Sequence, residues 1–212
     1  MSGRKRNTTP IGLGFRAVQG GSVVVGVALE AGEPPVVRSS FLATAAEGDR
    51  IAAEPYHVAA ESHRNALDKA AAVVAEGRKR QDQFTAGAEA DLLRTLIESS
   101  HAPIAGALLV NRSAWILDDL THCLSYPEHV RIAEELAVRN ALRFAFGQHG
   151  VQAVEMDEKT LPAMAAKDLG RPAAAIGERL DALGASGGRP WRKEQKLTCL
   201  AAWVAVAALR RS

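Results

Sequence analysis

The stretch from Ile11 to Ala45 constrains the fold most, because it carries the strongest β-strand signal in the chain. Valine at every second position from 23 to 27 is typical of a strand with one buried face. The turn residues Gln19 to Gly21 predict a tight hairpin, since glycine takes positive φ without steric cost. A second turn is predicted from Ala31 to Pro35, where prolines remove donors that a strand needs. The stretch therefore predicts a meander of three strands.

The rest of the chain predicts helices and two more strands. Ile104 to Val110 is uniformly apolar, as a strand buried on both faces is, and we expect it to run parallel to the first strand. Val151 to Met156 predicts the fifth strand. Helices are expected at 58–80, at 89–99, at 125–146 with Ser125 as its cap, at 157–170, at 171–184 and at 191–209. Gly77 and the charged residues that follow it, up to Asp82, predict a kink, a break or an exposed segment.

This order of elements predicts an α/β fold. We expect a mixed five-stranded sheet, made of a three-strand antiparallel meander plus two parallel strands, with helices on both faces. At 212 residues, of which 47% are hydrophobic and 24% charged, the chain suits a single domain over 10–212 behind a basic, flexible N-terminus over 1–9. The formal net charge of +2 indicates polyanion binding only if the cations gather on one face.

Other features of the sequence bear on location and chemistry. The basic N-terminus lacks the apolar core of an export signal, and the apolar run from Leu197 to Leu209 is shorter than the roughly 20 residues of a membrane span. Cys123 and Cys199 are far apart and predict neither a disulfide framework nor a zinc site. These features predict a cytoplasmic protein that does not associate with membranes.

Three segments carry a family resemblance. The opening Ile11 to Phe15, with sequence IGLGF, is similar to an IGID-type first strand. The helix from Ser125 to Arg139 and the segment from Pro190 to Lys196, which enters an alanine-rich last helix, complete the likeness. In these segments and in element order the chain resembles the ribonuclease H-like superfamily, and within it small bacterial proteins akin to the RuvC Holliday-junction resolvases. The resemblance implies nucleases whose divalent metals are held by carboxylates from the first strand, the end of the fourth strand and the last helix.

The residues at those three places depart from the pattern that the resemblance implies. Arg16 stands where the first-strand Asp is expected, Asn111 follows the fourth strand, and Glu194 supplies the carboxylate of the last helix. One carboxylate is too few to hold two Mg²⁺ ions. We therefore predict a catalytically degenerate protein, without a metal site or cofactor, that binds nucleic acid or a protein partner. The residues expected to contact nucleic acid are Arg16, Asn111, Arg192, Lys193 and Lys196.

Two alternatives remain open. The first is a Mg²⁺-dependent nuclease or resolvase with an atypical carboxylate set of Glu155, Asp157 and Glu194. The second is a structural subunit without catalysis that forms a homodimer through exposed apolar surface on the 89–99 helix or the last helix. Plain structural roles also suit several candidates, with Asp157 as a helix cap and Asn111 as a turn residue.

Overall fold

The computed structural model describes residues 9–29, 36–63, 65–100, 104–111, 119–187 and 189–209. Five strands form one mixed sheet in the order β3-β2-β1-β4-β5. The antiparallel meander consists of β1 (Ile11–Val18), β2 (Gly21–Ala28) and β3 (Val36–Ala43), whereas β4 (Ile104–Val110) pairs in parallel with β1 and with β5 (Ala153–Asp157). The predicted α/β fold with its mixed five-stranded sheet is confirmed.

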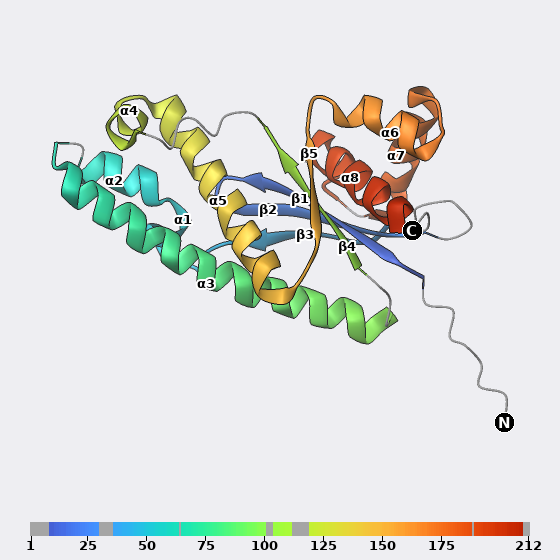
Figure 1. Cartoon of the computed structure of the whole chain (residues 1–212), viewed down its shortest axis with the longest axis horizontal. Coiled ribbons are helices and arrows are strands. Elements are labelled where there is room, and N and C mark those ends of the chain that lie inside the picture. The colour runs from blue at the N-terminus through green and yellow to red at the C-terminus, as the bar shows by residue number, and fades with distance from the viewer. Residues whose placement is uncertain are drawn as a thin grey trace.

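Helices cover both faces of this sheet (Figure 1). They are α1 (Arg50–Ala53), α2 (Pro55–His63), α3 (Leu67–Ser100), α4 (Leu120–Ser125), α5 (Pro127–His149), α6 (Leu161–Leu169), α7 (Ala173–Gly187) and α8 (Lys193–Leu209). One face packs on α3 and α5, through a core that joins Leu13 and Phe15 to Leu92 and Phe146. The other face packs on α6, α7 and α8. Helices α2 to α5 extend past the sheet and share a core of their own.

The contact between α8 and β1 is unusually close because two glycines of β1 face the helix. A Cβ on Gly12 would overlap the carbonyl oxygen of Ala202, and a Cβ on Gly14 would overlap that of Thr198. Glycine is therefore required at both strand positions for the backbones to approach. Thr198 and Ala202 are thus the α8 residues that meet β1, whereas Leu200 lies on the other side of the helix, in a pocket lined by residues of α6 and α7.

The first hairpin has the predicted turn. Val18 pairs with Gly21, and Gly20 between them has a φ of 75°. That left-handed conformation explains the glycine. The second predicted turn, at 31–35, and most of the predicted flexible N-terminus lie outside the described residues.

Of the alternatives at 77–82, a helix break is wrong, whereas Lys79 and Arg80 are exposed. Helix α3 runs without interruption over 34 residues, so the two helices expected at 58–80 and 89–99 are largely one. A side chain on Gly77 would overlap the carbonyl oxygen of Ile51 in α1, which shows that this glycine permits close packing rather than ending a helix. The break falls earlier, where Ala66 N donates to His63 O at 2.8 Å between α2 and α3.

The predicted cap at Ser125 is also wrong. Ser125 ends α4, and its Oγ donates to Thr121 O at 2.7 Å. Tyr126 occupies the N-cap of α5 without a side-chain hydrogen bond, and Pro127 opens that helix as expected. Gly150, with a φ of 66°, ends it just beyond the predicted boundary.

Two further expectations concern the membrane and the thiols. Within the described residues, none of the helices is both long and apolar enough to span a bilayer. Cys123 and Cys199 are buried free thiols. Burial raises the pKa of Cys123 to about 11 and that of Cys199 to about 12, so both stay protonated and unreactive at neutral pH.

Candidate functional site

The carboxyl ends of the parallel strands bring polar residues to one edge of the sheet. Arg16 lies near the end of β1, Asn111 directly follows β4, and Glu158 directly follows β5. The backbone N of Glu158 donates to Val110 O at 3.1 Å, which holds this residue against the end of β4. We call Arg16, Asn111, Arg139 and Glu158 the carboxyl-edge cluster.

Arg16 and Glu158 form a two-point ion pair within this cluster. Arg16 Nε lies 3.1 Å from Glu158 Oε1, and Arg16 Nη2 donates to Glu158 Oε2 at 3.3 Å. The two side chains are only 25% and 20% exposed, so solvent screens the pair incompletely. Arg16, predicted to contact nucleic acid, thus has its charge balanced by a carboxylate of its own chain.

Arg139 of α5 reaches the same edge from the other face of the sheet. Its Nη1 donates to Asn111 Oδ1 at 2.7 Å, and its Nη2 lies 3.8 Å from Glu135 Oε2. The side chain is 2% exposed, and burial lowers the pKa of this guanidinium, while the negative charges of Glu135 and Glu158 oppose the shift. The positive charge of Arg16 also lowers the pKa of Arg139. The Arg16–Glu158 ion pair and the Arg139–Asn111 hydrogen bond are therefore electrostatically coupled.

Glu194 belongs to the same edge by register. Gly14 faces Thr198, and the next β1 residue on that face is Arg16. Two strand residues advance about 6.6 Å and four helix residues about 6 Å, so Arg16 is level with Glu194, one turn before Thr198. Thr198 Oγ1 donates to Glu194 O at 2.7 Å within this turn. The three positions predicted from the family pattern therefore occupy one edge of the sheet.

The other two carboxylates of the atypical set have partners elsewhere. Glu155 Oε1 accepts from Arg143 Nε at 2.6 Å, and this hydrogen bond lowers the pKa of Glu155. Asp157 Oδ1 accepts from the backbone N of Lys159 and of Thr160, at 3.0 and 3.1 Å, in the turn before α6. Glu155 thus faces α5, on the opposite side of the sheet from α8.

The residues present do not fit a magnesium site. In the part of the chain that the structure describes, no three His, Cys, Asp or Glu side chains gather closely enough to hold a metal ion. The carboxyl-edge cluster instead contains two guanidinium groups, Arg16 and Arg139, which repel a divalent cation. Mg²⁺ requires oxygen ligands in near-octahedral geometry.

Exposed cations accompany Glu194 at the start of α8. Arg192 and Lys193 are both exposed, and the backbone N of Arg192 donates to Gln195 Oε1 at 3.0 Å, which caps the helix. Lys159 is exposed in the turn after β5. Lys196 pairs with Asp181 of α7. Three exposed positive charges therefore lie on segments that begin or end at the carboxyl edge.

Comparison with known proteins identifies the fold. No protein-family model and no curated protein matches the chain. The structure of T. thermophilus RuvC in complex with Holliday junction substrate superposes with a TM-score of 0.51 at 9% identity, over 95% of this chain and 95% of that chain. A second Thermus thermophilus RuvC structure gives 0.50 at 11% identity, over 95% and 96%. The chain has the RuvC-like form of the ribonuclease H-like fold.

The RuvC-like fold confirms the resemblance predicted from the sequence, and at this identity it shows the fold alone. Glu158 and Arg139 are members of the carboxyl-edge cluster that were not among the predicted site residues. Arg139 lies within the buried run from Leu136 to Leu142, where a charge requires a partner. The mainly apolar sequence around Arg139 was therefore the signal that could have identified it as a residue with a partner.

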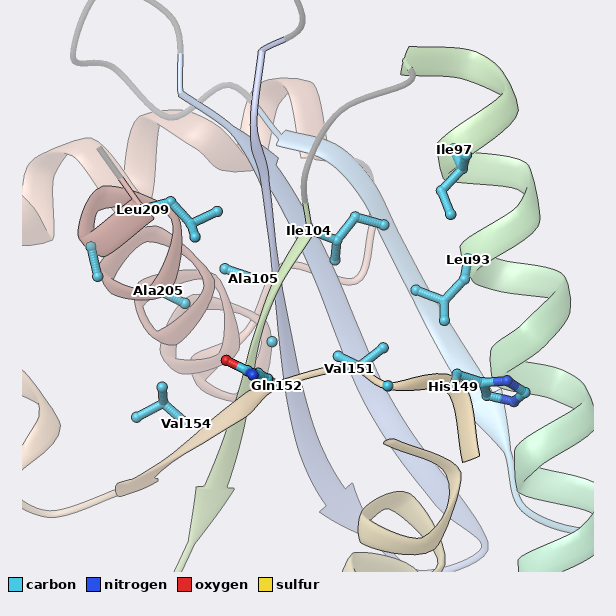
Figure 2. Close-up of a pocket in the computed structure, with 13 residues that line it drawn as sticks. Leu93, Ile97, Ile104, Ala105, His149, Val151, Gln152, Val154, Ala205 and Leu209 are labelled. Carbon is cyan, nitrogen blue, oxygen red and sulfur yellow. The ribbon is translucent and has the colours of Figure 1, made fainter. Parts of the chain in front are cut away.

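A groove of about 530 Å³ lies at the opposite edge of the RuvC-like sheet. Figure 2 shows Leu93 and Ile97 of α3 on one side of Ile104, with Ala205 and Leu209 of α8 on the other. Ile97 and Leu209 are 48% and 40% exposed. This amino-edge groove lies on the two helices that were predicted to expose apolar surface.

Proposed function

We propose that this RuvC-like protein binds branched DNA along the carboxyl edge of its sheet and does not cleave it. The observation that carries the proposal is the ion pair between Arg16 and Glu158, because the family resemblance predicts a metal-binding carboxylate where Arg16 stands. The fold supports the choice of ligand, because T. thermophilus RuvC was solved with a Holliday junction substrate.

Exposed cations provide the attraction in this proposal. Lys159, Arg192 and Lys193 lie on segments that meet the carboxyl edge, and phosphate contacts of this kind depend little on sequence. The hydrogen bond between Arg139 and Asn111 stabilises the carboxyl edge beneath these cations. No metal or cofactor has a role, since the guanidinium groups of the cluster oppose a divalent cation.

The test is fluorescence anisotropy with a labelled four-way junction over a salt series. We expect affinity to fall steeply with ionic strength, because binding displaces counterions from the phosphates. The double variant Arg192→Glu with Lys193→Glu should bind about tenfold more weakly or worse. The control Lys69→Glu with Lys79→Glu makes the same change in charge on exposed positions of α3 and should bind as the wild type does.

Cleavage is measured on the same junction with Mg²⁺ or Mn²⁺, and we expect the DNA to remain intact. Absence of binding at low salt would remove the DNA proposal. Cleavage that is lost in Glu194→Gln would instead establish the alternative, a nuclease with an atypical carboxylate set.

The amino-edge groove favours a second candidate role, self-association as a structural subunit. Ile97 and Leu209 expose apolar surface in this groove, and no Asp, Glu, Lys or Arg is among the described residues that line it. Such a surface favours an apolar partner. Light scattering should detect a dimer that Ile97→Glu converts to a monomer. Thr95→Glu, exposed on the same helix, should leave the dimer intact. A monomeric wild-type protein would contradict this role.

A further inference from the structure

A separate pocket of about 370 Å³ lies between α6, α7 and α8. Its floor is apolar: Ile176 and Leu180 of α7 and Leu200 of α8 are 4%, 7% and 4% exposed. Ile176 and Leu180 are one helical turn apart, and Leu197 and Leu200 form the facing side on α8. The pocket is therefore a groove between two ridges of apolar side chains.

One rim of this groove is basic. Lys193 and Lys196 line it from the first turns of α8. Lys196 pairs with Asp181, but these side chains are 37% and 67% exposed, and pairs in solvent are readily exchanged. Lys193 forms no ion pair with any residue that the structure describes. The rim thus keeps an excess positive charge beside an apolar floor.

We propose that this groove receives an acidic amphipathic helix of a protein partner. Apolar side chains at helical spacing would fill the space over Ile176 and Leu200, as in other complexes of a helix bound in a groove. Carboxylates beside them would pair with Lys193 and Lys196, so the groove would select acidic helices over basic ones. The inference goes beyond DNA binding: the groove lies between α6, α7 and α8, and of the cations proposed to attract DNA only Lys193 also lines it.

Gly177 gives a direct way to close the groove. It lines the pocket, and a Cβ built on it meets no atom within 4 Å, so a large side chain enters the groove without displacing backbone. Gly177→Phe should therefore fold and occupy the binding space. Gly87→Phe is the matched control, because Gly87 also lies within a helix with open space around its Cβ, on α3.

The probe is a labelled synthetic helix with leucines at positions i, i+3, i+4 and i+7 and glutamates at the flanking positions. Its comparison peptide carries lysine in place of every glutamate. By anisotropy, we expect the acidic peptide to bind at least about tenfold more tightly than the basic one. Gly177→Phe should weaken the acidic peptide by about tenfold or more, whereas Gly87→Phe should leave its affinity unchanged.

Equal affinity of the acidic and basic peptides, failure of the acidic peptide to bind, or full binding by Gly177→Phe would overturn the proposal. Dodecanoate is tested alongside: if it binds in a manner blocked by Gly177→Phe while the acidic peptide does not bind, the occupant is a small anionic amphiphile and the partner helix is overturned. Circular dichroism confirms that both glycine variants fold. Junction DNA should bind Gly177→Phe as it binds the wild type, so the two proposals fail separately.

Discussion

Arg16 of β1 and Glu158, directly after β5, are 142 residues apart in sequence, and Arg16 Nε lies 3.1 Å from Glu158 Oε1. The pair spans β4, which lies between the two strands in the sheet. It therefore fastens the end of the edge strand to the meander. A surface ion pair between neighbours on one helix would do nothing comparable for the fold.

We expect a double-mutant cycle with Arg16→Met and Glu158→Gln to give a coupling energy of about 1 kcal/mol, because the pair is largely shielded and makes two contacts. The measurement is urea unfolding of the four proteins. The exposed pair Arg50 and Glu61, whose side chains are 56% and 55% exposed, provides the comparison. Its cycle should show no measurable coupling. Equal coupling in both cycles would mean that the carboxyl-edge pair is an ordinary surface contact.

The close approach of β1 and α8 makes a second prediction. Gly14→Ala places a methyl group on the carbonyl oxygen of Thr198 and should lower the free energy of unfolding by about 3 kcal/mol. Gly87→Ala meets open space on a helix and should raise it by about 0.5 to 1 kcal/mol. Denaturant unfolding measures both. A small loss for Gly14→Ala would show that α8 can move away from the strand.

These glycines also explain which parts of the fold were predictable. The turn at Gly20 depends on local backbone conformation, so the sequence was sufficient to predict it. Gly77 looked like a helix breaker, but its role is set by Ile51 of α1, which approaches it only in the folded protein. Local signals predict local structure, and a glycine required for close packing gives no local signal that separates it from a breaker.

The candidate site likewise has a part that could be predicted from the sequence and a part that could not. The resemblance placed Arg16, Asn111 and Glu194 at one edge, since strand ends and the last helix follow from element order. It did not say which groups neutralise the arginine or bind the asparagine, because Glu158 and Arg139 approach them only through tertiary packing. The charge state of the edge could therefore not be derived from spacing.

Glu89 makes the stability of the protein depend on pH. It lies on the core-facing side of α3, with no hydrogen-bond partner for either oxygen among the described residues, and burial raises its pKa to about 8. The folded state therefore holds a proton that the unfolded chain releases near the ordinary pKa of 4.5. The resulting stability is full below pH 4.5, falls as the pH rises and is lost above a pH of about 8.

We expect the free energy of unfolding to fall by a few kcal/mol between about pH 5 and about pH 9, and Glu89→Gln to reduce this slope. Part of the slope should remain, because burial also raises the pKa of Glu134 to about 8. Glu98→Gln, an exposed change on the same helix, should keep the wild-type slope. Urea unfolding at each pH provides the values, and an unchanged slope in Glu89→Gln would contradict the assignment.

Asn111 tests whether Arg139 depends on a single neutral acceptor. Arg139 is buried, and its Nε has no hydrogen-bond partner among the described residues. The hydrogen bond from its Nη1 to Asn111 Oδ1, at 2.7 Å, is therefore important for stabilising the guanidinium. Asn111→Ala should lower the free energy of unfolding by about 2 to 3 kcal/mol, because it leaves a buried charge without this acceptor. Asn111→Asp keeps the shape and adds a negative charge, so it should be at least as stable as the wild type. Asn65→Ala, on an exposed residue, controls for loss of the amide. If Asn111→Ala and Asn65→Ala prove equally harmless, the charge of Arg139 must be stabilised by the carboxylates of Glu135 and Glu158 instead.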